Sequence, residues 1–96
     1  MKRLKISASA HRDLQNLAGH TRKRWGDEQK QSYLGEIRTA FQTIRENPEI
    51  GIDRSTLKAG YRSLACRQHI VFYRCDDDTI LIARIIHHRM DIQTHI

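Results

Sequence analysis

The chain has 96 residues, a formal net charge of +6 and 39% hydrophobic residues. This length allows a single domain over residues 1–96, whose small core leaves a thin stability margin. No apolar run approaches the roughly 18 residues of a membrane-spanning helix. Residues 1–25 also lack the apolar stretch of a signal peptide, so a secreted or membrane-embedded protein is not expected.

Positive charge is concentrated in two regions of the chain. Residues 1–25 have a net charge of +6 and residues 51–75 of +4, whereas residues 26–50 and 76–96 each have −2. Such a basic protein favours an acidic partner: nucleic acid, an anionic membrane surface or an acidic protein. Cys66 and Cys75 lie among apolar residues and form no CxxC motif. We interpret both as core residues in a reducing compartment and expect a cytoplasmic location.

The first half of the sequence predicts a strand and two helices. The alternation in MKRLKIS predicts a short strand, and Ser9 is a suitable N-cap for a helix that ends at Gly26. Asp27 can cap a second helix that stops at Asn47-Pro48, because the residue before proline avoids the α conformation. The short connection predicts an antiparallel hairpin. Its apolar stripes contain Leu14, Leu17, Ala18, Thr21 and Trp25 on one helix, and Tyr33, Ile37, Ala40, Phe41 and Ile44 on the other.

The second half predicts a loop and three strands. Residues 48–59 should form the loop, anchored by Ile50, Ile52 and Leu57. Strands are expected at about 60–67, 69–75 and 79–86, with a turn at residues 76–78 and a helical turn in the tail. We therefore predict an α+β fold of order β-α-α-β-β-β, an N-terminal strand plus a helix hairpin packed on an antiparallel meander sheet.

The last strand is apolar on both of its faces. Strict alternation puts Ile80, Ile82 and Ile86 on one face, and Leu81, Ala83 and Ile85 on the other. A strand of this kind needs cover on both sides, and the helix hairpin can cover only one. The second face must be covered by residues 48–59, by the tail or by another chain. We take the pattern as an indication of a protein partner.

Several short stretches occur together in an order typical of one protein family. They are Gly60-Tyr61-Arg62, the strand from His69 to Arg74 (HIVFYR), and the stretch from Arg84 to Asp91 (RIIHHRMD). With Asp13-Leu14, Asn47-Pro48 and Gly51, they resemble the ParE family of the RelE/ParE toxin superfamily over nearly the whole chain.

This resemblance implies a bacterial toxin that acts on DNA gyrase and traps the enzyme on cleaved DNA. It also implies a cognate antitoxin, ParD-like or of another type, whose C-terminal segment folds on the toxin and whose N-terminal domain binds operator DNA. No cofactor and no catalytic residue are then expected. Candidate antitoxin contacts are Leu14, Arg22, Lys23, Arg24, Trp25, Arg62, Tyr73 and Arg74; candidate target contacts are Arg84, His87, Arg89 and Met90.

The sister RelE-like family offers an alternative, ribosome-dependent cleavage of mRNA. That reaction needs an acid, a base and cations near the scissile phosphate, for which the candidates are Arg62, His69, Arg84, His87 and His88. The ending H-x-R-M-D is more similar to ParE, and the central loop contributes only Arg54 and Lys58 as cations.

Two other kinds of site are not expected from the sequence. Six histidines raise the question of a metal site, but His87 and His88 should point to opposite faces, and His11 and His20 are too far apart. Direct nucleic-acid binding lacks a helix-turn-helix, a zinc finger and an aromatic stacking platform. We therefore expect no metal, and contact with DNA only through the antitoxin.

Overall fold

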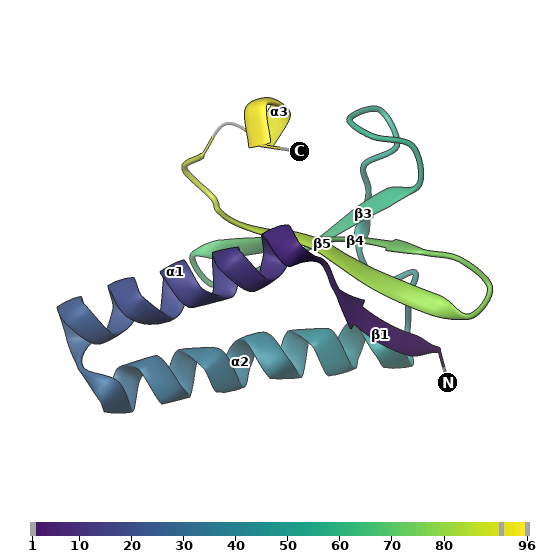
Figure 1. Cartoon of the computed structure of the whole chain (residues 1–96). Helices are drawn as coiled ribbons and strands as arrows, with labels where there is room; N and C mark the ends of the chain where they lie inside the picture. The colour runs from purple at the N-terminus through teal and green to yellow at the C-terminus, as the bar shows by residue number, and fades with distance from the viewer. Residues whose placement is uncertain (1, 91, 96) are drawn as a thin grey trace.

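The computed structural model describes residues 2–90 and 92–95 and has the predicted α+β architecture (Figure 1). The main elements, in chain order, are β1 (Arg3–Ile6), α1 (Ala8–Trp25), α2 (Asp27–Glu46), β2 (Ile52–Asp53), β3 (Tyr61–Cys66), β4 (His69–Cys75), β5 (Thr79–His87) and α3 (Ile92–His95). The five strands form one sheet in the order β1-β5-β4-β3-β2. β1 pairs with β5 in parallel and the other pairs are antiparallel, so the meander is confirmed, while β2 lies in the stretch expected to be loop.

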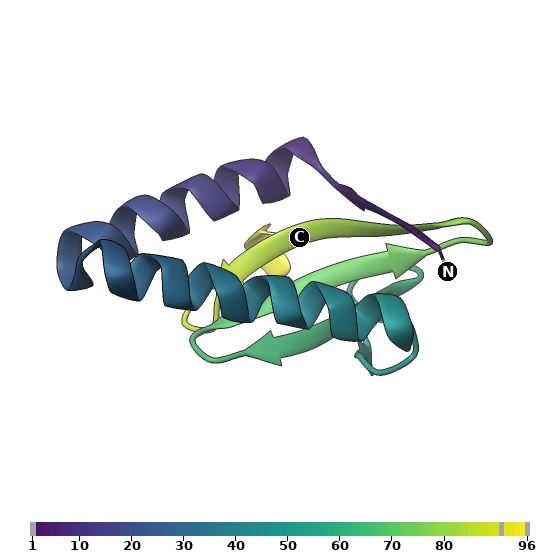
Figure 2. The same ribbon diagram turned by 90° about the horizontal axis from the view of Figure 1, so that it is seen from below.

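The helix hairpin packs on one face of the sheet and forms the main core with it (Figure 2). Leu17 of α1 and Ile37, Phe41 and Ile44 of α2 are buried there against Val71, Tyr73, Ile80, Ile82 and Ile85. Cys66 and Cys75 are partly buried free thiols that pack against the same core. Trp25 is not part of the buried apolar stripe that was predicted for α1. It is the last residue of this helix, and it is 63% exposed.

The two helices begin differently from the prediction. The N-cap of α1 is Ser7, not Ser9, because the chain turns into the helix directly after β1. The Ser7 hydroxyl accepts from the Ala10 amide at 3.0 Å and donates to the Ala83 carbonyl at 2.7 Å. Gly26, at φ 92°, ends α1 as predicted and is also the N-cap of α2. Asp27 lies inside the first turn of α2, where acidic residues interact favourably with the helix dipole.

A β-bulge in β5 corrects the predicted faces of that strand. Tyr73 pairs with Ile82 and Phe72 pairs with Arg84, so Ala83 is an extra residue on the β5 side. The alternation therefore changes phase at this point. Ile85 joins Ile80 and Ile82 against the helices, and Ile86 turns to the opposite face, the reverse of their predicted assignment.

The chain covers the second face of the sheet itself. Phe72, Ala83 and Ile86 are buried there with Tyr61, and Ile92 of α3 packs against them. Figure 1 shows α3 on the side of the sheet opposite the helix hairpin. The inference that β5 needs a second chain to cover it was therefore wrong. Among the described residues, no helix is long and apolar enough to cross a membrane.

Candidate functional site

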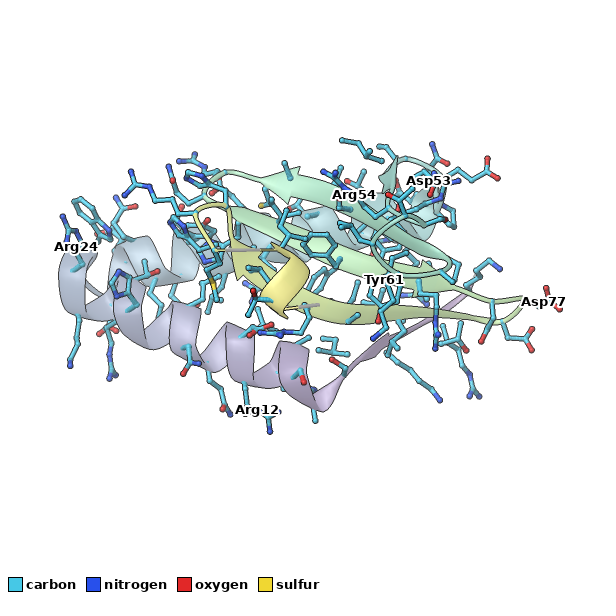
Figure 3. All side chains as sticks on the ribbon, turned by 90° about the horizontal axis from the view of Figure 1, so that it is seen from above. Arg12, Arg24, Asp53, Arg54, Tyr61 and Asp77 are labelled. Carbon is cyan, nitrogen blue, oxygen red and sulfur yellow. The ribbon has the colours of Figure 1, made fainter. Side chains whose placement is uncertain are left out.

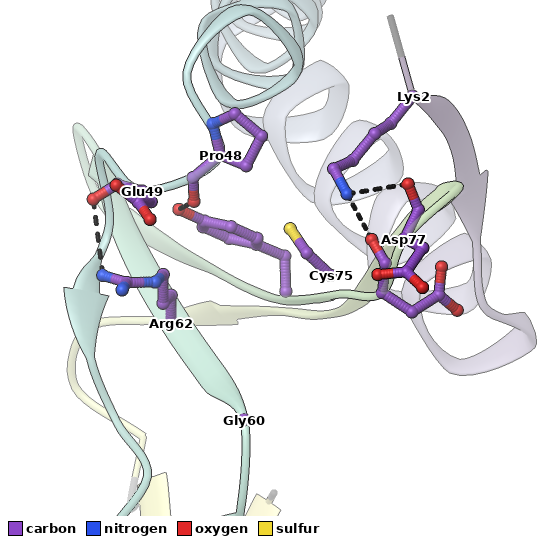
Figure 4. A pocket seen from close by; sticks show the side chains of 9 residues that line it. Lys2, Pro48, Glu49, Gly60, Arg62, Cys75 and Asp77 are labelled. Carbon is purple, nitrogen blue, oxygen red and sulfur yellow. Dashed lines mark hydrogen bonds between the residues drawn. The ribbon is translucent and has the colours of Figure 1, made fainter.

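Two of the candidate contact residues hold the fold together instead of facing a partner. Tyr73 is fully buried, and its hydroxyl donates to the Pro48 carbonyl at 2.7 Å and accepts from the Gly51 amide at 2.8 Å. Arg62 donates to the Glu49 carbonyl at 3.3 Å (Figure 4) and to the Gly51 carbonyl at 2.9 Å. These bonds attach the segment after α2 to the sheet. Tyr73 is therefore removed from the candidate partner contacts. Of the three predicted anchors of this segment, Ile50 and Ile52 are exposed and only Leu57 is half-buried.

Arg84 is likewise committed to an interaction inside the chain. Its guanidinium donates from Nε and Nη2 to the two carboxylate oxygens of Asp13, at 2.8 and 3.0 Å. The Asp13 carboxylate also accepts from the Ile85 amide at 2.8 Å, so it links α1 to β5 just after the bulge. The bond to Asp13 raises the pKa of Arg84 and keeps it charged. An arginine held in this way is poorly placed to contact gyrase or to stabilise a phosphorane.

Four aromatic side chains form a continuous row at the end of β5. Tyr33 Oη lies 2.6 Å from His69 Nδ1, and the rings of His69 and His87 meet edge to face at 5.3 Å. The rings of His87 and His88 stack at 4.6 Å. The prediction that His87 and His88 point to opposite faces was wrong, because β5 ends at His87 and the chain turns there.

Burial disfavours the charged form of two histidines in this row, His69 and His87. Burial, together with a smaller contribution from the neighbouring His87, lowers the pKa of His69 to about 4. Burial also lowers the pKa of His87, with a contribution from His88. His69 is thus a hydrogen-bonded neutral ring near neutral pH, which is unlike a general acid with a pKa close to the working pH.

A cleft of about 420 Å³ opens beside this row, between the end of α1 and the end of β5. Its cationic and aromatic side chains include Arg24, Trp25 and Arg89, and it is lined also by His20, Thr21, Tyr33, Gln68, His69 and His87. We call this site the histidine cleft. The sequence analysis missed His20, Tyr33 and Gln68. The spacing of His20 and Arg24, four residues apart, was the available signal, because it puts both on one side of α1.

A second hollow of about 520 Å³ lies between the two helices and is almost wholly apolar. Its walls come from Ile6 of β1, Leu14, Gln15 and Ala18 of α1, and Leu34, Ile37, Arg38 and Phe41 of α2. We call this site the helix groove. Leu14, a candidate antitoxin contact, is half-buried in it.

The basic run at the end of α1 is divided between different sides of the helix. Arg22 lies one turn after Ala18 and so on the side of the helix groove. Arg24 lies one turn after His20, on the side of the histidine cleft, and its guanidinium is 5.4 Å from the Trp25 ring (Figure 3). Lys23 is exposed between these two sides. The eight candidate antitoxin contacts thus do not form a single surface.

Among the remaining candidates, Arg74, His88, Arg89 and Met90 are exposed. Asp91, the last residue of the C-terminal motif, lies outside the described residues. No group of three or more His, Cys, Asp or Glu side chains suited to a metal ion occurs in residues 2–90 and 92–95.

The fold is shared with solved structures of bacterial toxins. The chain matches the chromosomal ParDE toxin–antitoxin structure from P. aeruginosa with a TM-score of 0.78 and 22% identity, over 91% of this chain and 96% of that one. YafQ from E. coli matches with a TM-score of 0.61 and 14% identity, over 92% and 94% of the two chains. The architecture is therefore shared with both of these structures.

Sequence similarity identifies the branch of these toxins. The family model of the ParE toxin of the type II toxin–antitoxin system parDE matches residues 4–92. The toxin ParE1 of Caulobacter vibrioides is 34% identical over 96 residues, all of this chain and 99% of that protein. The chain belongs to the ParE toxin family. As the toxin of a type II system, it has an antitoxin as its partner.

Proposed function

We propose that the chain inhibits DNA gyrase, trapping the enzyme on cleaved DNA, and that it does so in the cytoplasm. The observation that supports this proposal is the match to the ParE family over residues 4–92. The C-terminal segment His87, Arg89 and Met90 is the proposed gyrase contact, because Arg89 and Met90 are exposed beside the end of β5. Arg84 is left out, since Asp13 holds its guanidinium.

The arrangement of the histidines gives little support to the RelE-like alternative. Cleavage of RNA would need a cation directed at the phosphate, and Arg84 is directed at Asp13. It would also need a titrating acid or base, and burial keeps His69 neutral with a pKa of about 4. Gyrase inhibition makes no such demand, because gyrase itself cuts the DNA.

A supercoiling assay tests this proposal directly. Purified toxin added to gyrase, relaxed plasmid and ATP should stop supercoiling and should accumulate protein-linked linear DNA after detergent treatment. Prior addition of the antitoxin, sought in the neighbouring reading frame, should restore supercoiling. Cleavage of mRNA in a translation extract, with gyrase unaffected, would instead establish the ribonuclease. His87→Gln is then the variant with which to test the cleavage of mRNA. A change at Arg84 is less suitable, because it would also break the ion pair with Asp13.

We further propose that the antitoxin places an amphipathic helix in the helix groove. The groove is lined by Leu14, Ala18, Leu34 and Phe41, which match the apolar stripe of a helix. Arg38 lines the groove and Arg22 lies beside Ala18, so both sides of the groove carry positive charge. An acidic antitoxin helix would therefore be complementary in both apolarity and charge.

A further inference from the structure

We infer that the histidine cleft is a binding site for single-stranded nucleic acid, in which Trp25 stacks on an unpaired base while Arg24 and Arg89 bind the adjoining phosphates. This function goes beyond gyrase inhibition, and its test does not require gyrase. It also replaces the expectation that the toxin touches DNA only through its antitoxin. That expectation rested on the lack of a helix-turn-helix, a zinc finger and an aromatic platform, and an exposed Trp25 offers an aromatic surface.

Trp25 is presented in an unusual way for a tryptophan. It is the only tryptophan of the chain and is 63% exposed at the end of α1, where no sheet lies beneath it. The Arg24 guanidinium lies 5.4 Å from the centre of its ring. Proteins that bind single strands without reading sequence combine these two features, an aromatic ring for the base and cations for the backbone.

The charge of the cleft favours an anionic ligand. Arg24 and Arg89 enter it from α1 and from the segment after β5, and neither has a carboxylate partner among the described residues. The lining side chains within residues 2–90 and 92–95 include no Asp or Glu. Asp13, the nearest acidic side chain on α1, is already paired with Arg84.

The polar side chains of the cleft can donate hydrogen bonds to a phosphodiester, and they can donate to or accept from a base edge. His20 and Gln68 are exposed at its rim, and His87 is partly exposed. Behind these side chains, the contacting rings of Tyr33, His69 and His87 form a wall of the cleft. The groove on the other side of α1 is apolar, so a protein helix is better suited to that groove than to this cleft.

The ligand is single-stranded because the stacking face of a base is available only when the base is unpaired. A duplex would contact Arg24 and Arg89 through phosphates alone and would leave Trp25 unused. We expect this site to bind the nucleic acid without cleaving it, because Tyr33 engages His69 and Asp13 engages Arg84. DNA and RNA single strands share this chemistry, and the experiment separates them.

Fluorescence of the single tryptophan provides a direct test with the full chain. Oligothymidine and oligouridine, titrated at low salt, should quench Trp25 emission as a base stacks on the ring, whereas a duplex of the same length should quench it much less. A stronger response to one of the two single strands identifies the natural ligand. Poly-glutamate is the acidic-protein competitor and should leave the emission unchanged.

Four variants separate the cleft from general electrostatic attraction. By anisotropy of a labelled oligonucleotide, Trp25→Leu should bind about ten-fold more weakly, and Trp25→Phe should retain most of the affinity. Arg24→Gln should reduce the slope of log K against log salt by about 0.7, the value for one phosphate contact on a single strand. Arg12→Gln removes the same charge from an exposed position of α1 outside the cleft and should leave affinity nearly unchanged.

Several results would overturn the inference. They are the absence of quenching by both single strands, equal quenching by the duplex or by poly-glutamate, and an equal loss in Arg12→Gln and Arg24→Gln. None of these results bears on gyrase, so a toxin that fails here but still blocks supercoiling would refute the nucleic-acid site alone.

Discussion

At the scale of single residues, the Asp13 carboxylate is the most heavily used polar group between the helices and the sheet. It accepts from two nitrogens of Arg84 and from the Ile85 amide, and it is only 13% exposed. Removing its charge takes from the half-buried Arg84 guanidinium the carboxylate that it bonds at two points, and it weakens the bond to the bulged strand.

We therefore expect Asp13→Asn to lower the free energy of unfolding by about 2 kcal/mol. The measurement is urea unfolding followed by circular dichroism. The matched control is Asp27→Asn, because the Asp27 side chain is 77% exposed and lies 3.7 Å from Lys30. A surface pair of this kind contributes less than about 1 kcal/mol. Similar losses of unfolding free energy in the two variants would show that the Asp13–Arg84 pair contributes no more to stability than an exposed pair.

His69 gives the fold a pH dependence of defined sign. Its pKa is lowered from 6.5 to about 4, first by burial and then by His87, so the unfolded chain binds a proton more readily than the folded chain. The stabilising contribution is complete above pH 6.5 and is lost as the pH falls toward 4. The groups that face His69 are Tyr33, His87, His88, His20 and Asp13, of which Asp13 acts in the opposite direction.

The expected result is a melting temperature that falls more steeply between pH 6.5 and 4 for the native protein than for His69→Gln. Carboxylates also titrate in this range, so the difference between the two proteins isolates the histidine. His11→Gln, at an exposed position of α1, should keep the native slope. Parallel curves for the native protein and His69→Gln would contradict this account.

At the scale of elements, Gly51 shows how tightly the segment after α2 is held against β4. A Cβ at this position would lie 2.5 Å from Tyr73 Oη and 2.9 Å from the Ser63 carbonyl oxygen. A Cβ at Gly19, in the middle of α1, would meet nothing within 4 Å. Replacement by alanine should therefore have opposite effects on stability at the two glycines.

We expect Gly51→Ala to destabilise the protein by about 2 kcal/mol, because the added methyl separates the hydroxyl of Tyr73 from the backbone that it anchors. Gly19→Ala should stabilise the protein by up to about 1 kcal/mol through its higher helix propensity. Chemical unfolding of both variants measures the two changes in the free energy of unfolding. Destabilisation by Gly19→Ala, or tolerance of Gly51→Ala, would contradict the packing described for these segments.

The elements also show where sequence reasoning succeeds and where it fails. Helix ends at Gly26 and Asn47 and the three meander strands follow from local chemistry, which the sequence displays directly. The bulge at Ala83 could not be predicted, because it depends on the register between β4 and β5. One extra residue exchanged the faces of Ile85 and Ile86. The argument that β5 needs cover from another chain failed for a different reason, because Ile92 of α3 packs on the second face.

At the scale of the whole molecule, α1 separates two surfaces of different chemistry. The helix groove is apolar with basic edges, and the histidine cleft is polar, aromatic and basic. The sequence analysis named Leu14 in the groove and five residues of the cleft as candidate site residues, but it assigned Leu14 and Arg24 to the same partner contact. Their separation depends on helical spacing and on the position of β5, which only the folded chain defines.

This separation predicts that charge on the groove side controls recognition of the antitoxin independently of charge elsewhere. In Arg22→Glu/Arg38→Glu the edges of the groove repel an acidic helix, so the association rate at low salt should fall about ten-fold or more. Arg12→Glu/Lys23→Glu changes the net charge equally at exposed positions away from the groove and should associate at nearly the native rate. Stopped-flow mixing with the cognate antitoxin measures both rates. If both doubles slow association equally, net charge alone steers the antitoxin and the groove is not its entry point; if only the first does, the acidic segment of the antitoxin approaches α1 from the side of α2.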